Sequence, residues 1–400
     1  MHKIGAMILE KYLNMCAGNF DGQAKCAQGH QIKYMEIREK EIMTVLGKIV
    51  LKRKYYYDKE CKQGCCPKDE ELRIEGTSFS PGVQRMMVRA GSNRPFALSQ
   101  EDISEFAGLE INAKEVERYC QQLGKEAEEY INQMQPRQEH KAQDILYINM
   151  DGTGVPMVPE ETQGRIGKSE DGRARTREAK LGCIFTQTTT DQNNNPIRQE
   201  NSTTYVGGIS TTEEFNKLIN EEASRRGIDK AKKVCVLGDG ALWIWNIAKD
   251  RFFNATEIVD LFHAREHYWE PARLVFPAGS KSQSKWIDKR REQLDNGKVE
   301  LVIRAIKRLK PKTIEAKQVC QKAVHYFEQN KHRMRYDKFR AQGLFVGSGV
   351  IEAGCRTIVA QRLKQSGMHW TVAGANSIIT LRCLLQSRRW EDFWEFRAAA

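Results

Sequence analysis

Two short apolar runs, each leading into an Asp-Gly pair, are the feature that most strongly constrains the fold of this 400-residue chain. Ile145–Met150 leads into Asp151, and Lys233–Leu237 leads through Gly238 into Asp239. Apolar runs of this length with such flanks are typical of buried strands. An acidic residue at the carboxyl end of a parallel strand lies where α/β sheets place their functional sites. The sequence therefore predicts an α/β sheet with two carboxylates at one edge.

The elements around these runs predict the rest of the sheet. Further strands are expected over 180–190, 202–209 and 255–260, with a helix from Thr211 or Thr212 to about Arg226. This order of strands and helices is that of an RNase H-like mixed α/β core. An α-helical, basic insertion at about 264–340 is expected to interrupt the core, and two helices over about 350–365 and 371–387 are expected to complete it.

The remaining chain predicts two smaller regions, so three domains are expected at 1–79, 80–143 and 144–400. From Leu9 to about Asp69 the pattern predicts short strands and turns. In the helical region, Ser99 is expected to cap a helix ending near Ala107, and Asn112 a second helix ending near Leu123. This arrangement is that of a DNA-binding helix-turn-helix, in which Arg118 would face DNA, and equally that of an ordinary helical hairpin.

Charge favours a polyanionic partner, because the formal net charge is +12 and Lys and Arg gain affinity by displacing counterions from phosphates. The candidate phosphate contacts lie in a basic loop and on one face of an insertion helix; they are Arg173, Arg175, Arg177, Arg304, Lys307 and Arg308. An ordinary solvated surface is the alternative for both.

No apolar run reaches membrane-spanning length, and the eleven cysteines are an odd number, so a cytoplasmic, nucleoid-associated protein without a disulfide framework is expected.

The two carboxylates predict a metal site, because they would repel each other unless a cation lay between them. Glu352, which opens a helix, is expected to supply a third carboxylate. Oxygen ligands of this kind suit Mg²⁺ or Mn²⁺, and a pair of such ions is suited to phosphodiester chemistry. Arg356, one turn after Glu352, would contact phosphate or pair with Glu352. Alternatively, each acid only caps a helix or closes a turn.

Several segments together resemble the ISKra-type bacterial insertion-sequence transposases. They are Asp151-Gly-Thr-Gly-Val-Pro156, Arg175-Thr-Arg-Glu-Ala-Lys-Leu-Gly-Cys183, Gly238-Asp-Gly-Ala-Leu-Trp-Ile-Trp-Asn246, Phe262-His-Ala-Arg-Glu-His267, Gly347-Ser-Gly-Val-Ile-Glu-Ala-Gly-Cys355 and Arg362-Leu-Lys-Gln-Ser-Gly-Met-His-Trp370. The resemblance implies a catalytic DDE triad at Asp151, Asp239 and Glu352, with a helical insertion before the glutamate as in Mutator-like transposases. Asp260-Leu-Phe-His263 resembles the Asp/Cys-x-x-His signature of relatives of that group, which implies a role for His263 at the site.

The same resemblance implies a zinc-ribbon-like element near the amino terminus. Cys26 and Cys61 fit one member of each expected cysteine pair, and His30, Cys65 or Cys66 would complete the set. Zinc accepts His and Cys ligands in a closed tetrahedral site. The alternative is that the metal has been lost and the hairpin folds alone.

The activity that the resemblance implies is metal-dependent DNA cleavage and strand transfer at insertion-sequence ends. The partners would be double-stranded terminal inverted repeats and target DNA, bound by a homo-oligomer. Two alternatives stay open: a catalytically silent, transposon-derived DNA-binding regulator, and an RNase H-like nuclease that cuts without joining.

Overall fold

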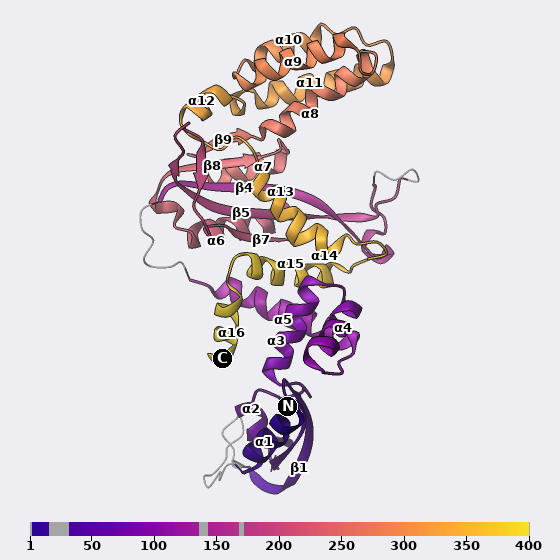
Figure 1. Ribbon diagram of the computed structural model, residues 1–400, viewed down its shortest axis with the longest axis vertical. Coiled ribbons are helices and arrows are strands. Elements are labelled where there is room, and N and C mark those ends of the chain that lie inside the picture. The colour runs from indigo at the N-terminus through magenta and orange to yellow at the C-terminus, as the bar shows by residue number, and fades with distance from the viewer. Residues whose placement is uncertain (1, 16–31, 136–142, 168–171, 400) are drawn as a thin grey trace. The chain divides into compact units, whose positions relative to one another are not determined.

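The computed structural model describes residues 2–15, 32–135, 143–167 and 172–399, and the chain divides into two compact units, Met1–Gly124 and Lys125–Ala400 (Figure 1). The boundary lies inside helix α5 (Ala113–Gln133), so this helix contributes residues to both units. Among the described residues, no helix combines the length and the apolar character needed to cross a membrane.

A β-hairpin and a helix form the first part of the first unit. The elements are α1 (His2–Met15), β1 (Lys33–Thr44), β2 (Gly47–Asp58), β3 (Gln63–Cys65) and α2 (Pro67–Glu71). The three strands pair antiparallel in the order β1-β2-β3. The prediction of strands and turns from Leu9 on is wrong for α1, because Ala6, Leu9 and Leu13 share one helical face and pack against an apolar cluster of the hairpin.

Three helices complete the first unit: α3 (Pro81–Asn93), α4 (Phe96–Ala107) and α5. The prediction that Ser99 caps a helix is wrong. Ser99 is fully buried inside α4, and its hydroxyl donates to the carbonyls of Arg94 and Pro95. Asn112 does cap α5, because its side-chain oxygen accepts the Lys114 N–H at 2.8 Å. Helix α5 continues ten residues beyond the expected end at Leu123.

A six-stranded mixed sheet forms the centre of the second unit. Its strands are β4 (Gln143–Pro156), β5 (Thr176–Thr190), β6 (Pro196–Arg198), β7 (Thr204–Gly208), β8 (Ala231–Gly238) and β9 (Thr256–Val259). The order is β6-β5-β4-β8-β9, and β7 pairs with β5. Strands β4, β8 and β9 are parallel, whereas β5 is antiparallel to β4. The predicted mixed α/β sheet is confirmed.

Helices cover both faces of this sheet (Figure 1). They are α6 (Thr212–Arg225), α7 (Leu242–Arg251), α13 (Gly349–Gly354), a π-helical segment (Cys355–Ala360), α14 (Gln361–Leu363) and α15 (Val372–Gln386). Helix α16 (Trp390–Ala399) follows α15 and contacts it. Gly182 of β5 lies against Ile219 of α6, and the neighbouring Leu181 lies against Gly354 of α13. Because successive strand residues point to opposite faces, α6 and α13 cover opposite sides of β5.

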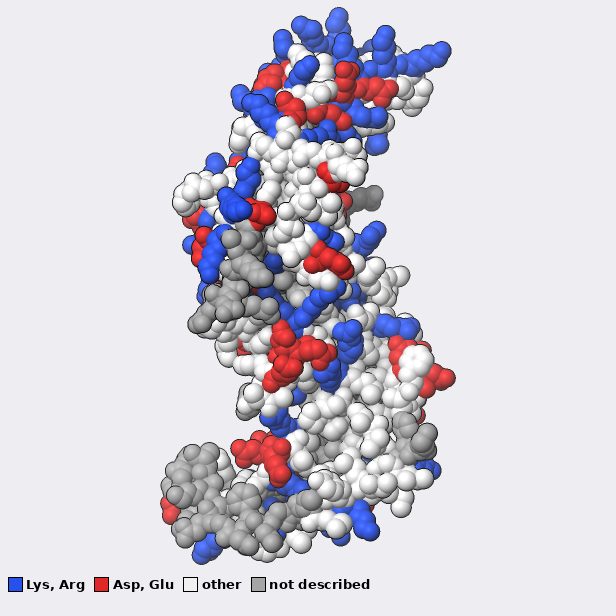
Figure 2. Space-filling view, turned by 60° about the vertical axis from the view of Figure 1, so that its left-hand side comes forward, with Lys and Arg blue, Asp and Glu red and all other residues white. Residues whose placement is uncertain are grey.

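A helical insertion lies between β9 and α13 in the chain. Its helices are α8 (Leu261–Val275), α9 (Lys281–Asp295), α10 (Val299–Lys307), α11 (Ile314–Asn330) and α12 (Tyr336–Ala341). The Leu261 N–H donates to the Val346 carbonyl at 2.9 Å, so the two ends of the insertion meet beside the sheet. Figure 2 shows Lys and Arg side chains gathered over these helices.

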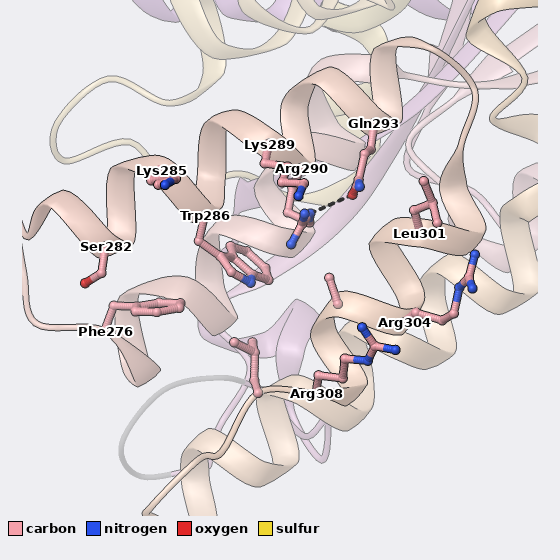
Figure 3. A pocket seen from close by; sticks show the side chains of 12 residues that line it. Phe276, Ser282, Lys285, Trp286, Lys289, Arg290, Gln293, Leu301, Arg304 and Arg308 are labelled. Carbon is pink, nitrogen blue, oxygen red and sulfur yellow. Dashed lines mark hydrogen bonds between the residues drawn. The ribbon is translucent and has the colours of Figure 1, made fainter.

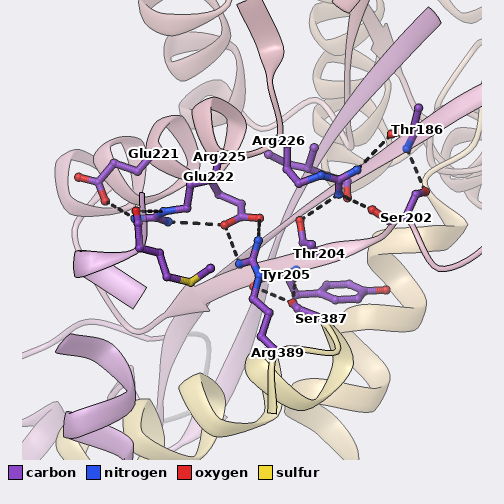
Figure 4. A network of polar contacts seen from close by, with 12 residues as sticks. Thr186, Ser202, Thr204, Tyr205, Glu221, Glu222, Arg225, Arg226, Ser387 and Arg389 are labelled. Carbon is purple, nitrogen blue, oxygen red and sulfur yellow. Dashed lines mark hydrogen bonds and ion pairs between the residues drawn. The ribbon is translucent and has the colours of Figure 1, made fainter. Parts of the chain in front are cut away.

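A buried ion-pair network joins α6 to the end of the chain (Figure 4). Glu222 of α6 is fully buried and accepts two hydrogen bonds from Arg389, at 2.9 and 2.7 Å. Arg225 lies 3.5 Å from the same carboxylate. Burial would raise the pKa of Glu222, but the charge and hydrogen bonds of Arg389, a hydrogen bond from Thr204 and the charge of Arg225 hold this pKa below its ordinary value of 4.5. Glu222 is therefore charged in the folded protein at neutral pH.

Candidate functional site

Asp151 lies inside β4 rather than at its end. Strand β4 continues to Pro156 because β5 pairs with it as far as Pro156↔Thr176. The parallel partner β8 stops at Gly238, and its last pair with β4 is Asn149↔Leu237. The prediction that Asp151-Gly ends the strand is wrong, because a long antiparallel partner satisfies the backbone beyond this point. Asp151 nevertheless lies where β4 loses its neighbour β8.

Asp239 follows β8 directly, on the neighbouring strand. The register pairs Asn149 with Leu237, so two further residues on each strand bring the chain to Asp151 and Asp239. Neighbouring strands lie about 4.7–4.9 Å apart. The Asp239 carboxylate accepts the Ala241 N–H at 2.9 Å, which shapes the loop into α7. The two acids therefore come from matching positions on adjacent parallel strands.

Glu352 comes from a helix packed on the same part of the sheet. Helix α13 contacts β4 and β5, and Glu352 accepts a hydrogen bond from the Ser348 hydroxyl at 2.7 Å. The π-helical segment begins three residues later, and the thiol of Cys355 hydrogen-bonds the Asp151 carboxylate. This contact ties the Glu352 helix to the strand that carries Asp151. Arg356 is exposed, one turn after Glu352.

The three carboxylates interact electrostatically. Burial raises the pKa of Asp151, hydrogen bonds from Cys355 and the Gly152 N–H lower it, and the negative charges of Asp239 and Glu352 raise it further, so the net shift is upward. An all-oxygen donor set with crowded negative charge fits Mg²⁺ or Mn²⁺ chemically. Within the described residues, however, no three His, Cys, Asp or Glu side chains lie close enough together to hold one ion. The metal site at this triad stays a prediction.

Asp260 joins the segments that carry these acids. It is fully buried, and its backbone N–H donates to the Gly238 carbonyl at the end of β8. Its carboxylate accepts the backbone N–H groups of His263, at the start of α8, and of Ser348, just before α13. One buried side chain thus connects β8, the insertion and the Glu352 helix. The sequence pattern singled out Asp260 only through its spacing from His263.

His263 belongs to an aromatic cluster beside Asp239. Its Nε2 lies 3.3 Å from Nε2 of His267, whose ring stacks on Tyr326 at 3.6 Å between centroids. The Tyr326 hydroxyl donates to the Asp239 carbonyl at 2.8 Å. Burial, followed by the neighbouring His263, lowers the pKa of His267 to about 4, so His267 is neutral at neutral pH. Sequence reasoning missed Tyr326, which lies 87 residues from Asp239 and forms no local motif with it.

Gly240 is required by this cluster. Its φ is +108°, and a Cβ added there would lie 2.5 Å from the Tyr326 ring. We expect Gly240→Ala to lower the free energy of unfolding by about 3 kcal/mol, from overpacking added to backbone strain. Gly279→Ala is the control, because Gly279 has φ +70° but no atom within 4 Å of an added Cβ, and only about 1 kcal/mol of strain is expected there. Urea unfolding of the two variants would measure both losses in unfolding free energy. Equal losses in the two variants would contradict the packing argument.

The basic residues predicted to contact phosphate fall into separate groups. Arg173 and Arg175 line a hollow of about 910 Å³ that also includes Arg165 and His369, and Arg177 lies 3.4 Å from Glu161.

Of the insertion residues, Arg304 and Arg308 line a groove between α9 and α10 (Figure 3). Lys307 does not line this groove; it pairs with Glu328 of α11 at 2.6 Å. The structure thus places Arg304 and Arg308 at the groove beside α9, whereas the Lys307 ammonium is paired with a carboxylate of α11.

The first unit holds the remaining predicted positions. Arg118 is exposed on α5 and pairs with Glu115 at 2.5 Å. Of the predicted zinc ligands, Cys26 and His30 lie outside the described residues, whereas Cys61 and Cys65 lie near β3. Asp58 is buried and accepts the N–H groups of Glu60 and Cys61. This aspartate closes the turn after β2.

The second unit combines a mixed α/β sheet with a basic helical insertion, and it carries Asp151 inside β4 and Asp239 directly after the neighbouring parallel strand β8. The chain belongs to UPF0236, an uncharacterised protein family, which it matches over residues 1–388. No curated protein matches the sequence. Among solved structures, it is similar to the Drosophila P element transposase strand transfer complex at 9% identity, with 81% of this chain and 83% of that chain covered and a TM-score of 0.28.

Proposed function

We propose that the chain is a DDE transposase that cuts insertion-sequence ends and joins them to target DNA. The observation that carries the proposal is the register of β4 and β8, in which Asp151 and Asp239 follow matching positions on adjacent parallel strands. Glu352 supports it, because its helix packs on β4 and its charge raises the pKa of Asp151. In this proposal, the sheet and its helices are an RNase H-like core.

Asp151, Asp239 and Glu352 would hold Mg²⁺ or Mn²⁺, which when bound supplies Lewis-acid stabilisation of phosphate oxygens. The protein's own residues position this set. The buried Asp260 carboxylate holds the backbone of Ser348, four residues before Glu352. Tyr326 holds the Asp239 carbonyl, and the His263–His267 pair lies against the Tyr326 ring. In the proposal, His263 acts near the scissile phosphate and Arg356 contacts DNA.

The test is an assay with a DNA carrying the inverted repeats that flank the gene, supplied with a target plasmid and Mg²⁺. Metal-dependent cleavage followed by joined products supports the proposal. Cleavage without joining would favour a nuclease. Repeat-specific binding without cleavage would favour a DNA-binding regulator, in which α5 with Arg118 would be the recognition element.

The groove cations supply a second, independent prediction about DNA. Arg304 and Arg308 line the groove, and neither has an acidic partner among the described ion pairs. We expect Arg304→Gln combined with Arg308→Gln to weaken binding to specific and random duplexes alike. Loss of two phosphate contacts reduces the slope of log K against log salt by about 2. Fluorescence anisotropy at several salt concentrations measures this.

Lys307→Gln is the matched control for this prediction, because it removes a neighbouring positive charge that is already paired with Glu328. It is expected to change the salt slope less than the double variant does. If the double variant kept the wild-type slope, Arg304 and Arg308 would belong to an ordinary solvated surface.

A further inference from the structure

The groove between α9 and α10 has a composition that phosphate contacts alone do not explain (Figure 3). Its volume is about 640 Å³, within the range of about 300–1,000 Å³ that is usual for ligand pockets. Five of its lining side chains are cationic: Lys285, Lys289, Arg290, Arg304 and Arg308. The other lining residues are Phe276, Ser282, Trp286, Gln293, Leu301, Ala305 and Leu309. The described lining thus contains no acidic residue.

Arg290 is the unusual member of this set. It is 7% exposed, and its Nε donates to the Gln293 side-chain oxygen at 2.7 Å. Among the described ion pairs, Arg290 has no carboxylate partner, and burial lowers its pKa. A buried cation without a counter-charge is unfavourable. An anion bound in the groove would supply that counter-charge.

The apolar part of the groove points to a ligand with a flat ring. The Trp286 ring lies 5.9 Å from that of Phe276, and the Arg290 guanidinium lies 5.1 Å from the Trp286 ring centroid. Figure 3 shows Trp286 and Arg290 on the side of α9 that faces α10. Both aromatic rings are only partly buried. Duplex DNA keeps its bases stacked inside, so an aromatic surface of this kind gains contact only from an unpaired base.

We propose that this groove binds one unpaired nucleotide of a DNA strand, with its phosphate at Arg290, Arg304 and Arg308 and its base against Trp286. Lys285 and Lys289 would extend the contact to neighbouring phosphates. That the strand is DNA rests on the proposed function. The cationic and aromatic lining of the groove is observed independently of that function. The inference assigns the helical insertion a second task beyond holding duplex, namely capturing a strand where it is not paired.

The experiment measures binding of the full chain to a labelled single-stranded oligonucleotide by fluorescence anisotropy. Trp286→Leu keeps an apolar side chain but removes the stacking surface. We expect it to weaken single-strand binding roughly tenfold, as loss of one aromatic–base stack does. Binding to a duplex of the same length is expected to change less than about twofold. Trp269→Leu is the matched control, because Trp269 is another half-buried tryptophan of the insertion, with Arg273 over its ring at 5.6 Å, and it does not line the groove.

A second measurement uses the wild-type chain and therefore does not depend on a variant that folds. An oligonucleotide with abasic positions should bind the wild type more weakly than the intact strand, and about as weakly as the intact strand binds Trp286→Leu. Equal binding of intact and abasic strands would overturn the proposal, as would competition by free mononucleotide as effective as that by the strand. Neither readout involves cleavage, so failure of the groove proposal is distinguishable from failure of the transposase proposal.

Discussion

Asp239→Asn is expected to abolish DNA cleavage while leaving DNA binding unchanged. The substitution keeps the shape of the side chain but removes one of the negative charges that would hold a divalent cation. Loss of an essential group in a catalytic set that works as a unit lowers the rate by on the order of 10³-fold or more. The rate of Mg²⁺-dependent cleavage of repeat DNA measures the effect, and anisotropy with the same DNA measures binding.

Asp144→Asn is the matched control, because Asp144 lies on the same strand as Asp151 and pairs with Lys232 near the protein surface. It should cleave DNA at the wild-type rate. A stability readout supports the activity assay. Mg²⁺ should raise the melting temperature of the wild type and have little effect on Asp239→Asn, because a ligand stabilises only the state that binds it. Cleavage by Asp239→Asn near the wild-type rate would refute the assignment of Asp239.

Glu222→Ala is expected to have the largest effect on stability. Arg389 and Arg225 would remain in the interior without the carboxylate that neutralises them. Removing one partner of a buried ion pair costs about 3–5 kcal/mol, because the other charge stays buried. Urea unfolding at pH 7 measures the loss. Glu221→Ala is the control: the adjacent Glu221 is partly exposed and pairs with Lys217 and Arg225, so a loss within about 1 kcal/mol is expected.

The buried ion pair of Glu222 with Arg389 also predicts that the stability of the protein depends on pH. The folded protein holds the pKa of Glu222 below the ordinary value of 4.5. The stabilisation is therefore fully present above about pH 4.5 and is lost as the pH falls through the lowered pKa of the folded state. Glu222→Gln should show a smaller fall in unfolding free energy over this acid range than the wild type. An identical acid dependence would mean that Glu222 is not charged in the folded protein.

Many strands and helices of the second unit could be predicted from the sequence, because apolar runs and helix caps are signals within a few neighbouring residues. Apolar runs identified strands β4, β5, β8 and β9, and the Thr211 cap identified the start of α6. Local signals do not predict the structure where a distant partner decides it. Asp-Gly after an apolar run is ordinarily a turn, but β5 pairs with β4 through Asp151. Ser99 is an ordinary cap residue, but in α4 it is buried and bonds backwards along the chain.

The sequence by itself determined which residues carry the candidate chemistry: Asp151, Asp239 and Glu352 stand out through their residue types and flanking glycines. Only the tertiary structure decided how they are held. The register of β4 and β8, the Asp260 hydrogen bonds to two backbone segments and the contact of Tyr326 with Asp239 all join residues remote in the chain. The tertiary structure likewise decided that Arg304 lines the groove beside α9 and that Lys307 pairs with Glu328 of α11. Such contacts depend on which elements pack together. Local spacing shows which residues share a face of a helix or strand, but it does not show which distant element covers that face.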